Sequence, residues 1–312
     1  MTVTRKQIRQ AMLDEDIFGG LYGTATTGAP LQLTDTTLLK VAGKSSSLFG
    51  NYFLYRPAAA TASDVVRRVT MTGYTSDDGI LTHAGPAWTT DPLESSDSGY
   101  YELWKYDPVL VNRAITRAFQ TRLFSIQQDD ITTNGQTRYE VGASPFSLSS
   151  IESDDQILEV GQVWGTDPNA RVRVWTKEGR TWWPEPDNDT LYIRFDPPPS
   201  GTIRITWKKP YTALSDDTTT STVDKEWAVW ASAFELFIGL SRAAQMNGET
   251  SANYDQLKDY AYGRERSLRR KFMNRWASQL ITPRPRWRSS ASAPRMGRGF
   301  TSALGGDGGR TI

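Results

Sequence analysis

Histidine is the residue type most often used for acid–base chemistry near neutral pH, and this chain has one, His83. A catalytic or metal-binding histidine usually works beside a carboxylate or a second ligand, and the stretch Leu81-Thr-His-Ala-Gly85 contains neither. Cysteine is absent, which excludes disulfides, thiolate metal sites and a cysteine nucleophile. The lack of cysteine also suits assembly in a reducing compartment. His83 therefore gives little support for catalysis.

Paired carboxylates are the next candidates for chemistry. Three adjacent pairs, Asp129–Asp130, Asp154–Asp155 and Asp216–Asp217, each lie within two residues of Ser or Thr, so we interpret them as solvated turns. Asp187-Asn-Asp189 resembles the start of a calcium loop, but the glycine and glutamate that such a loop requires are missing. Nucleotide-binding, zinc-protease and serine-hydrolase motifs are also absent. We predict no enzyme activity, no cofactor and no metal.

Aromatic residues suggest a binding role in one stretch. Trp182 and Trp183 follow Trp175 closely, and tryptophans on a strand face can stack on sugars, which is typical of carbohydrate-binding modules. Polar residues that would orient a sugar are not obviously clustered around them. We therefore favour a hairpin whose aromatic residues pack on a neighbouring element or on a second copy of the chain.

The carboxyl-terminal residues 261–312 carry twelve Lys or Arg against two acidic residues. Because the whole chain is at +1, this segment carries about +10 and the preceding 260 residues about −9. Arg outnumbers Lys there by eleven to one, and Arg pairs with carboxylates as well as phosphates and is enriched at protein interfaces. The Pro/Arg/Gly/Ser-rich part beyond Thr282 is expected to order only on binding. A solvated, disordered tail is the alternative.

Four segments have helical spacing and could position these residues. Thr4 and Gln7 form a capping-box pattern before the first, which ends near Asp16. Asp107–Pro108 begins the second with an N-cap and a proline at the first helical position. The third begins near residue 221 and the fourth near residue 251. The short turn between these two predicts an antiparallel helical hairpin.

Between the helices, apolar and polar residues alternate as in strands. The predicted strands are 51–55, 65–71, 79–82, 138–141, 156–160, 171–175, 191–195 and 202–207. The order α–β–α–β–α–α does not suit a doubly wound sheet. We predict an α+β fold in which a small helical bundle is interrupted by two β-rich insertions and followed by an extended C-terminal arm. The predicted helical core is residues 1–20, 105–125 and 221–280; the insertions are 30–104 and 130–212; and the arm is 281–312.

Membrane association is not expected. The longest apolar runs fall short of the ~18 residues that a spanning helix needs. The amino terminus, Met1-Thr-Val-Thr-Arg-Lys-Gln7, lacks the apolar region of a secretory signal. We therefore expect a protein that is soluble and intracellular when made.

Four stretches carry a family resemblance that spans most of the chain. They are the short N-terminal helix, the segment from Tyr106 to Ala118, the hairpin from Leu191 to Gly201 leading to Asp216, and the segment from Trp227 to Leu236 with the basic helix after it. In this arrangement the chain resembles the head-to-tail adaptor (connector or neck) proteins of tailed bacteriophages.

The resemblance implies a structural virion protein at the head–tail junction, assembled in the host cytoplasm. It implies a homo-oligomeric ring, commonly of twelve copies, that docks beneath the portal protein and also meets a tail or neck protein such as a terminator, nozzle or stopper. Genomic DNA would pass through the ring without sequence-specific binding. A carbohydrate- or receptor-binding tail protein that uses Trp182 and Trp183 is the alternative.

Mapped onto this chain, the resemblance predicts two sets of contact residues. The arm would reach the portal through Arg284, Arg286, Trp287, Arg288, Arg295, Arg298 and Phe300. Neighbouring copies in the ring would pack through Trp227, Trp230, Phe234, Leu268, Phe272 and Trp276. Both large β-rich intervals depart from the smallest members of the family.

Overall fold

The structure is a computed structural model of the chain. It describes residues 2–29, 32–35, 49–57, 65–69, 80–82, 87, 99–148, 151, 156–164, 171–175, 182–187 and 190–280. Of residues 27–29, 164, 171–175 and 274–280 it describes the backbone alone.

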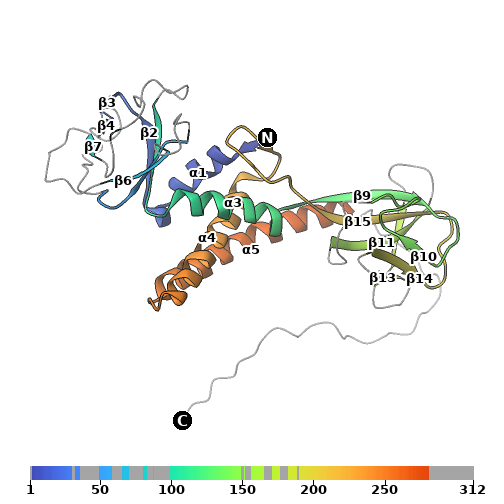
Figure 1. The fold of residues 1–312 in the computed structure, drawn as a ribbon. Helices are drawn as coiled ribbons and strands as arrows, with labels where there is room; N and C mark the ends of the chain where they lie inside the picture. Colours follow the sequence, from blue (N-terminus) through green and yellow to red (C-terminus); the bar gives the residue numbers. More distant parts are fainter. Residues whose placement is uncertain are drawn as a thin grey trace, which may run out of the picture.

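Figure 1 shows an elongated molecule with helices at its centre and strands gathered at each end. The helices of the described residues are α1 (Arg5–Leu13), α3 (Pro108–Thr121), α4 (Lys225–Met246) and α5 (Ala252–Leu280), with the short 3-10 helix η1 (Asp16–Phe18). α4 and α5 form an antiparallel hairpin, and α4 also contacts α1 and α3.

Local sequence signals explain where the helices begin. Thr4 accepts a hydrogen bond from the Gln7 amide and the Gln7 side chain accepts one from the Thr4 amide, which confirms the predicted capping box of α1. Asp107 caps α3, whose first residue is Pro108, and Asp224 caps α4. Each cap satisfies amide groups that have no partner inside the helix.

α4 is the central helix of the molecule. Its residues 227–237 are buried on almost every side, and they include Trp227, Trp230 and Phe237. A helix that is apolar all round must be covered all round, and here α1, α3 and α5 supply the cover. Phe18 of η1 stacks on Phe237 with ring centroids 5.8 Å apart, which ties the chain after α1 to α4.

Two antiparallel sheets, built from residues between 21 and 104, lie at one end of the molecule. One has the order β2–β8–β5–β6 and the other β3–β4–β7. Their strands are β2 (Leu21–Thr24), β3 (Thr27–Ala29), β4 (Gln32–Thr34), β5 (Phe53–Tyr55), β6 (Val66–Arg68), β7 (Ile80–Thr82) and β8 (Tyr100–Trp104). Leu33, Leu54, Leu81, Tyr101 and Leu103 belong to a core that these sheets share.

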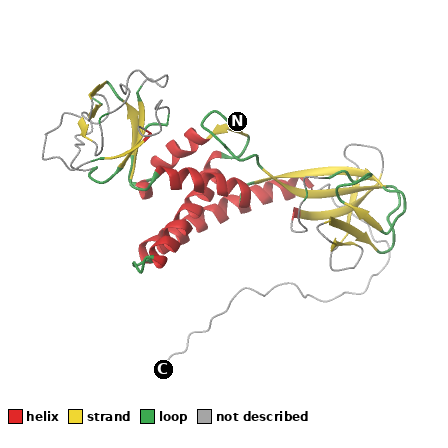
Figure 2. Cartoon of the chain, in the orientation of Figure 1, coloured by secondary structure: helices red, strands yellow, loops and turns green. Residues whose placement is uncertain are grey.

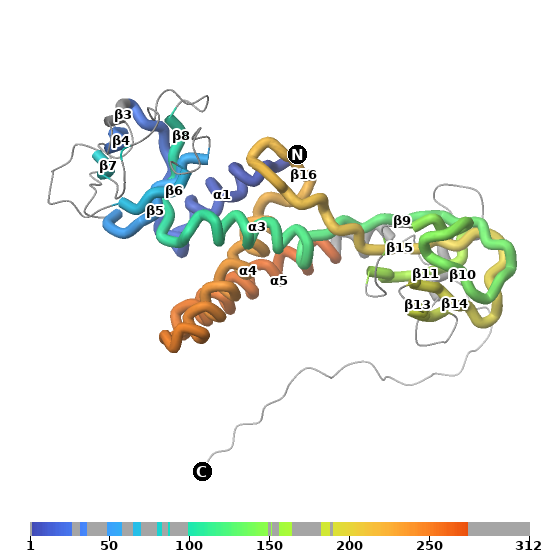
Figure 3. The backbone as a smooth tube through the Cα atoms, in the orientation of Figure 1, coloured from blue at the N-terminus to red at the C-terminus, as the bar shows by residue number. Residues whose placement is uncertain are grey.

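Two more antiparallel sheets lie at the opposite end, with the orders β12–β11–β15–β9 and β10–β14–β13. Their strands are β9 (Phe124–Thr132), β10 (Arg138–Glu140), β11 (Ile157–Trp164), β12 (Arg171–Trp175), β13 (Trp182–Asp187), β14 (Thr190–Phe195) and β15 (Thr202–Pro210). Figure 3 shows β9 and β15 running together from the helices into these sheets. A separate core fills the space between them.

The smallest sheet fastens the amino terminus. β1 (Val3–Thr4) pairs with β16 (Thr220–Ser221), directly before the cap of α4. The first residues of the chain are thereby held against the segment that returns from β15 to the helices.

The predicted fold class is wrong, because the protein is not a helical bundle. Helix accounts for 37% and strand for 34% of the described residues, and the strands form five small antiparallel sheets. Figure 2 shows strands at both ends of the molecule. Each end has its own apolar core, separate from the helical core, so the strands are more than excursions from a bundle.

Two strands that sequence patterning missed, β8 and β9, explain much of this error. Their alternation is hidden by acidic residues, Glu102 in β8 and Asp129 and Asp130 in β9. β8 is the second strand of its sheet, and β9 pairs with β15 over nine residues. Without β8 the predicted strand 51–55 lacks one of its two neighbours, and without β9 the predicted strand 202–207 lacks its longest pairing.

Candidate interaction surface on α5

Several of the residues singled out in the sequence lie outside the described part of the structure. They are His83, the pair Asp154–Asp155, the portal contacts predicted between Arg284 and Phe300, and the side chain of Trp276. Their proposed roles stay predictions.

The first acidic pair is part of a strand. Asp129 accepts a hydrogen bond from the Trp207 indole at 2.6 Å. Asp130 receives two from the Arg204 guanidinium, at 2.6 and 2.7 Å. Both donors lie on β15, the partner of β9, so these carboxylates hold the two strands together. The interpretation of this pair as a solvated turn is wrong.

Asp217 belongs to a buried network around Arg9. The Arg9 side chain is fully buried and donates to Asp217 at 2.6 and 2.7 Å, to Glu102 at 2.9 Å and to Asn112 at 3.1 Å. Glu102, also fully buried, accepts further hydrogen bonds from the Tyr100 hydroxyl at 2.9 Å and the Trp104 indole at 2.7 Å. One guanidinium therefore links α1, β8, α3 and the segment before β16.

Contacts within the network shift the pKa values of Arg9 and Tyr100. Burial lowers the pKa of Arg9, but hydrogen bonds and charges from Asp217 and Glu102 outweigh burial and raise it overall. Burial and the Glu102 carboxylate both raise the pKa of Tyr100, so its phenol stays protonated. Charges held in this way are matched by partners inside the chain, which indicates a structural role.

The tryptophans considered for sugar binding differ in exposure. Trp182 is 2% exposed and belongs to the core between the two sheets formed by β9 to β15. Trp183 is half-buried, and the Arg194 guanidinium lies 5.5 Å from its ring centre. Because Trp182 is covered, the pair cannot form an open stacking platform in this conformation.

Two of the predicted contacts between copies lie in the core of the single chain. Trp227 is 2% exposed, donates to Glu265 at 3.2 Å and packs 5.1 Å from the Phe272 ring. Trp230 is fully buried and meets Tyr260 edge-on at 5.5 Å. Both indoles therefore join α4 to α5 within one chain and are not accessible to a neighbouring copy.

The remaining described members of that set are half-buried. Leu268 and Phe272 pack against the helical core, and Phe234 contacts Tyr262 with ring centroids 5.3 Å apart. The Arg122 guanidinium covers Phe234 at 3.9 Å. Whether these three side chains meet a second copy stays a prediction.

Exposed side chains of α5 form a distinct surface next to these residues. Between positions 260 and 271 the exposed arc of the helix contains aromatic, small and cationic residues and no acidic residue. We call this surface the basic face of α5; it consists of Tyr260, Tyr262, Gly263, Arg264, Arg266, Ser267, Arg270 and Lys271.

The cations of the basic face have no ionic partner within the described chain. No carboxylate there lies within 4.0 Å of the charged groups of Arg264, Arg266, Arg270 or Lys271. Arg264 instead lies over the buried Trp230 ring, 5.2 Å from its centre. Arg269, on the edge of the face, approaches Glu265 at 3.8 Å. Four positive charges are thus presented to the surroundings.

The first half of α5 has a different character. Asp255 accepts hydrogen bonds from Lys258 at 2.7 Å, Ser251 at 2.8 Å and Ser241 at 2.9 Å. These contacts, led by that of Lys258, lower the pKa of Asp255 to about 2. Positive charge in this half is therefore balanced locally.

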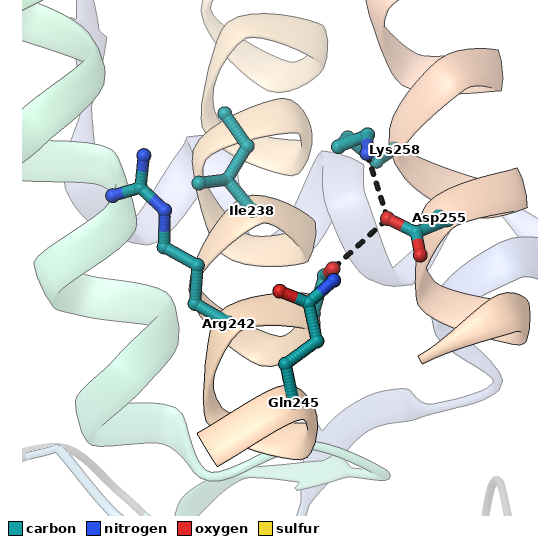
Figure 4. A pocket seen from close by; sticks show the side chains of 6 residues that line it. Ile238, Arg242, Gln245, Asp255 and Lys258 are labelled. Atoms are coloured by element: carbon teal, nitrogen blue, oxygen red, sulfur yellow. Dashed lines mark hydrogen bonds and ion pairs between the residues drawn. The ribbon is translucent and has the colours of Figure 1, made fainter. Parts of the chain in front are cut away.

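A small hollow opens beside Asp255 near the tip of the hairpin, with a volume of about 220 Å³. Figure 4 shows Asp255 linked to Lys258, while Arg242 turns its guanidinium away from both. Ligand pockets are typically about 300–1,000 Å³ and largely apolar, and this hollow is smaller and lined mainly by polar side chains. The basic face of α5 is therefore the stronger candidate for an interaction site.

No protein-family model and no curated protein matches the sequence of this chain. Among the described residues, no helix has both the length and the apolar content that crossing a bilayer requires. In the same part of the chain, no three acidic or imidazole side chains gather into a potential metal site.

Proposed function

We propose that this protein is a structural head–tail adaptor of a tailed bacteriophage, which forms a homo-oligomeric ring under the portal protein. In this role it would connect the portal to a tail or neck protein and leave a path for the genome. The proposal assigns it a role in assembly and no catalytic role. The virion neck would be its place of action.

The observation that supports this proposal most is the uneven distribution of charge along α5 and beyond it. Charge is balanced around Asp255, whereas the basic face presents four cations without ionic partners. α5 then leads directly into residues 281–312, which carry six Arg, no Lys and one acidic residue. A positive surface that the rest of its chain does not neutralise favours association with an acidic partner.

The acidic remainder of the chain is compatible with a DNA conduit. The first 260 residues carry about −9. Acidic surface facing DNA would repel phosphate and limit adhesion of the passing genome. The elongated shape, with sheets at both ends of the helices, offers separate surfaces for partners above and below a ring.

Attachment to the portal can be tested with two variants. One ends at Thr282, and the other keeps full length but has Gln in place of Arg284, Arg286, Arg288, Arg295 and Arg298. We expect both to fold like the parent, judged by circular dichroism and thermal unfolding, and to lose co-purification with the portal protein of the same phage. Because the second variant preserves length, it separates loss of charge from loss of chain.

Negative-stain electron microscopy of the chain, alone and mixed with the portal, tests the ring itself. Closed rings stacked on portal particles are the expected result. Undiminished portal capture by both variants would contradict the role of the arm. Failure of the parent chain to form rings or to bind the portal under any condition would contradict the proposed function.

A further inference from the structure

We infer that the basic face of α5 is a contact surface for a second copy of this chain. The inference rests on the proposed ring. It assigns the contact between copies to an exposed surface, because Trp227 and Trp230, which were predicted to make that contact, are buried. The contact would join the basic face of one copy to acidic surface elsewhere on the next. Such a heterologous contact repeats in one direction and closes into a ring when the rotation allows.

The residue types of the basic face favour a protein partner. Tyr and Arg are enriched at the energetic centres of protein interfaces, and Lys is depleted there. The described face contains three Arg, two Tyr and one Lys. Tyr260 is 49% and Tyr262 38% exposed, which leaves considerable aromatic surface available for contact.

Side chains of α4 and α3 hold much of this face in place. Trp230 supports both Tyr260 and Arg264, and Phe234 supports Tyr262. Phe234 is itself covered by Arg122, the C-cap residue of α3. Side chains that are already ordered lose less conformational entropy on binding, so the face is prepared for a contact before a partner arrives.

Gly263 has no structural purpose within the described chain. It lies in the interior of a 29-residue helix, where glycine is less favourable than alanine. A methyl group added at Gly263 would meet no atom within 4 Å beyond the backbone of its own helix. Ser267 follows one turn later on the same exposed arc. Two small residues between arginines would let the backbone of a partner approach α5 closely.

Charge complementarity identifies the partner as another copy. The segment 261–312 carries about +10 and the first 260 residues about −9, so each copy contains both halves of a nearly neutral pair. Nucleic acid would instead be repelled by most of the chain. Contacts between opposite charges on successive copies would speed assembly and set its orientation, and salt would weaken them.

The first experiment reverses charge on the face. We expect Arg266→Glu/Arg270→Glu to raise the dissociation constant for self-assembly of the full-length chain about a hundredfold, because like charges would then face each other. The control is Arg113→Glu/Arg242→Glu, which makes the same change of net charge at two exposed helical arginines with no ion pair in the described chain. Sedimentation velocity at several concentrations measures both.

The second experiment uses a pair of helical glycines. Gly239 of α4 is also exposed, and a methyl group added there likewise meets nothing within 4 Å. Gly263→Ala should weaken assembly about tenfold through steric contact with the partner, although the isolated chain becomes more stable. Gly239→Ala should give the same stabilisation without weakening assembly.

Several outcomes would overturn the inference while leaving the proposed ring intact. One is ring formation by the Arg266→Glu/Arg270→Glu variant as strong as that of the parent. Another is a loss of self-assembly in the Arg113→Glu/Arg242→Glu control as large as the loss in that variant. Binding to duplex DNA at low salt that depends on Arg266 and Arg270, with assembly unchanged, would make nucleic acid the occupant. A parent chain that stays monomeric with and without the portal would contradict the proposed function as well.

Discussion

Two groups of arginines in this molecule behave in opposite ways. Arg9 is fully buried, and its guanidinium is shared among Glu102, Asp217 and Asn112. Arg266 and Arg270 are exposed on α5 and have no ionic partner in the described chain. The first group uses its charge inside the fold, whereas the second leaves its charge free for a partner.

The difference separates arginines that stabilise the fold from arginines that are available to bind a partner. A buried charge is costly unless it is paired and hydrogen-bonded, so loss of one member of the Arg9 network should be severe. An exposed arginine without an ionic partner contributes little to the stability of the fold, so its loss should leave the isolated chain almost unchanged.

Arg9→Met should have the largest effect. It removes the cation beside the fully buried Glu102 and should lower the free energy of unfolding by about 3–5 kcal/mol. Urea unfolding followed by tryptophan fluorescence measures the change. In the double variant Arg9→Met/Glu102→Gln, the buried negative charge is also removed and part of the loss should be recovered. A loss of unfolding free energy below about 1 kcal/mol for the single variant would contradict the buried ion pair between Arg9 and Glu102.

Glu235→Ala should have an intermediate effect. Glu235 lies on α4 and pairs at 3.0 Å with Arg117 of α3 and at 2.6 Å with Arg122, the C-cap residue that follows α3. Its side chain is 5% exposed, while that of Arg117 is 55% exposed and can return to water when the carboxylate is lost. We expect a loss of about 1.5–3 kcal/mol in urea unfolding, the range for hydrogen bonds to charged groups. Arg117→Ala is the matched control and should cost less than Arg122→Ala.

Asp217 should give the Arg9 network a dependence on pH. Burial raises the pKa of Asp217, but the hydrogen bonds and charges of Arg9 and Arg5 outweigh burial and lower it below the ordinary value of 3.8. The stability that follows from a lowered pKa is present above pH 3.8 and is lost as the pH falls through the folded-state pKa.

The measurement compares Asp217→Asn with the parent across this range. In thermal unfolding from pH 6 down to pH 2, the variant should start less stable and lose less stability below about pH 4. Asp216→Asn separates the two causes, since in the described chain Asp216 bonds to Ser215, Thr218 and Thr219 and those hydrogen bonds lower its pKa without Arg9. Its curve should also flatten at low pH, and the flattening should persist in an Arg9→Met background, whereas that of Asp217→Asn should not. Parallel curves for Asp217→Asn and the parent would argue against the ion pair with Arg9.

Local signals made the helices predictable from the sequence. Thr4 with Gln7, Asp107 with Pro108, and Asp224 lie within a few residues of the amides that they cap or of the turn that they begin. Helical spacing also makes the apolar stripe Leu257, Ala261 and Leu268 of α5 visible in the sequence, and all three pack against the helical core.

Long-range pairing defeated prediction of the sheets. Glu102 looks like a break in a strand until Arg9, 93 residues earlier, neutralises it. Asp129 is likewise satisfied by Trp207, 78 residues later. Each acidic residue and its partner are too far apart to fall in one short stretch of sequence. An acidic residue in a strand therefore cannot be told from an acidic residue in a turn by its sequence neighbours alone.

The candidate site was only half predictable, for a related reason. The excess of arginine in the carboxyl-terminal segment is visible in the sequence, but exposure is not. Tryptophan is a residue type common at interfaces, and Trp227 and Trp230 were therefore predicted to contact a neighbouring copy. In the structure α5 covers both within the same chain. Tyr260 and Tyr262 are exposed and were missed. Helical spacing shows which residues share a face, but it does not show how much of a side chain beside the apolar stripe is covered by other elements.

Arg266→Ala and Arg270→Ala should have the smallest effect on the isolated chain. Neither side chain has an ionic partner in the described residues, and alanine favours a helix slightly more than arginine, so each change in unfolding free energy should stay within about 0.5 kcal/mol. Urea unfolding at a concentration where the chain is monomeric checks this, with Arg9→Met measured alongside. A loss above about 1 kcal/mol at either position would mean that the charge is used within the fold. The basic face would then belong with Arg9 as a structural feature, and the distinction between the two groups of arginines would fail.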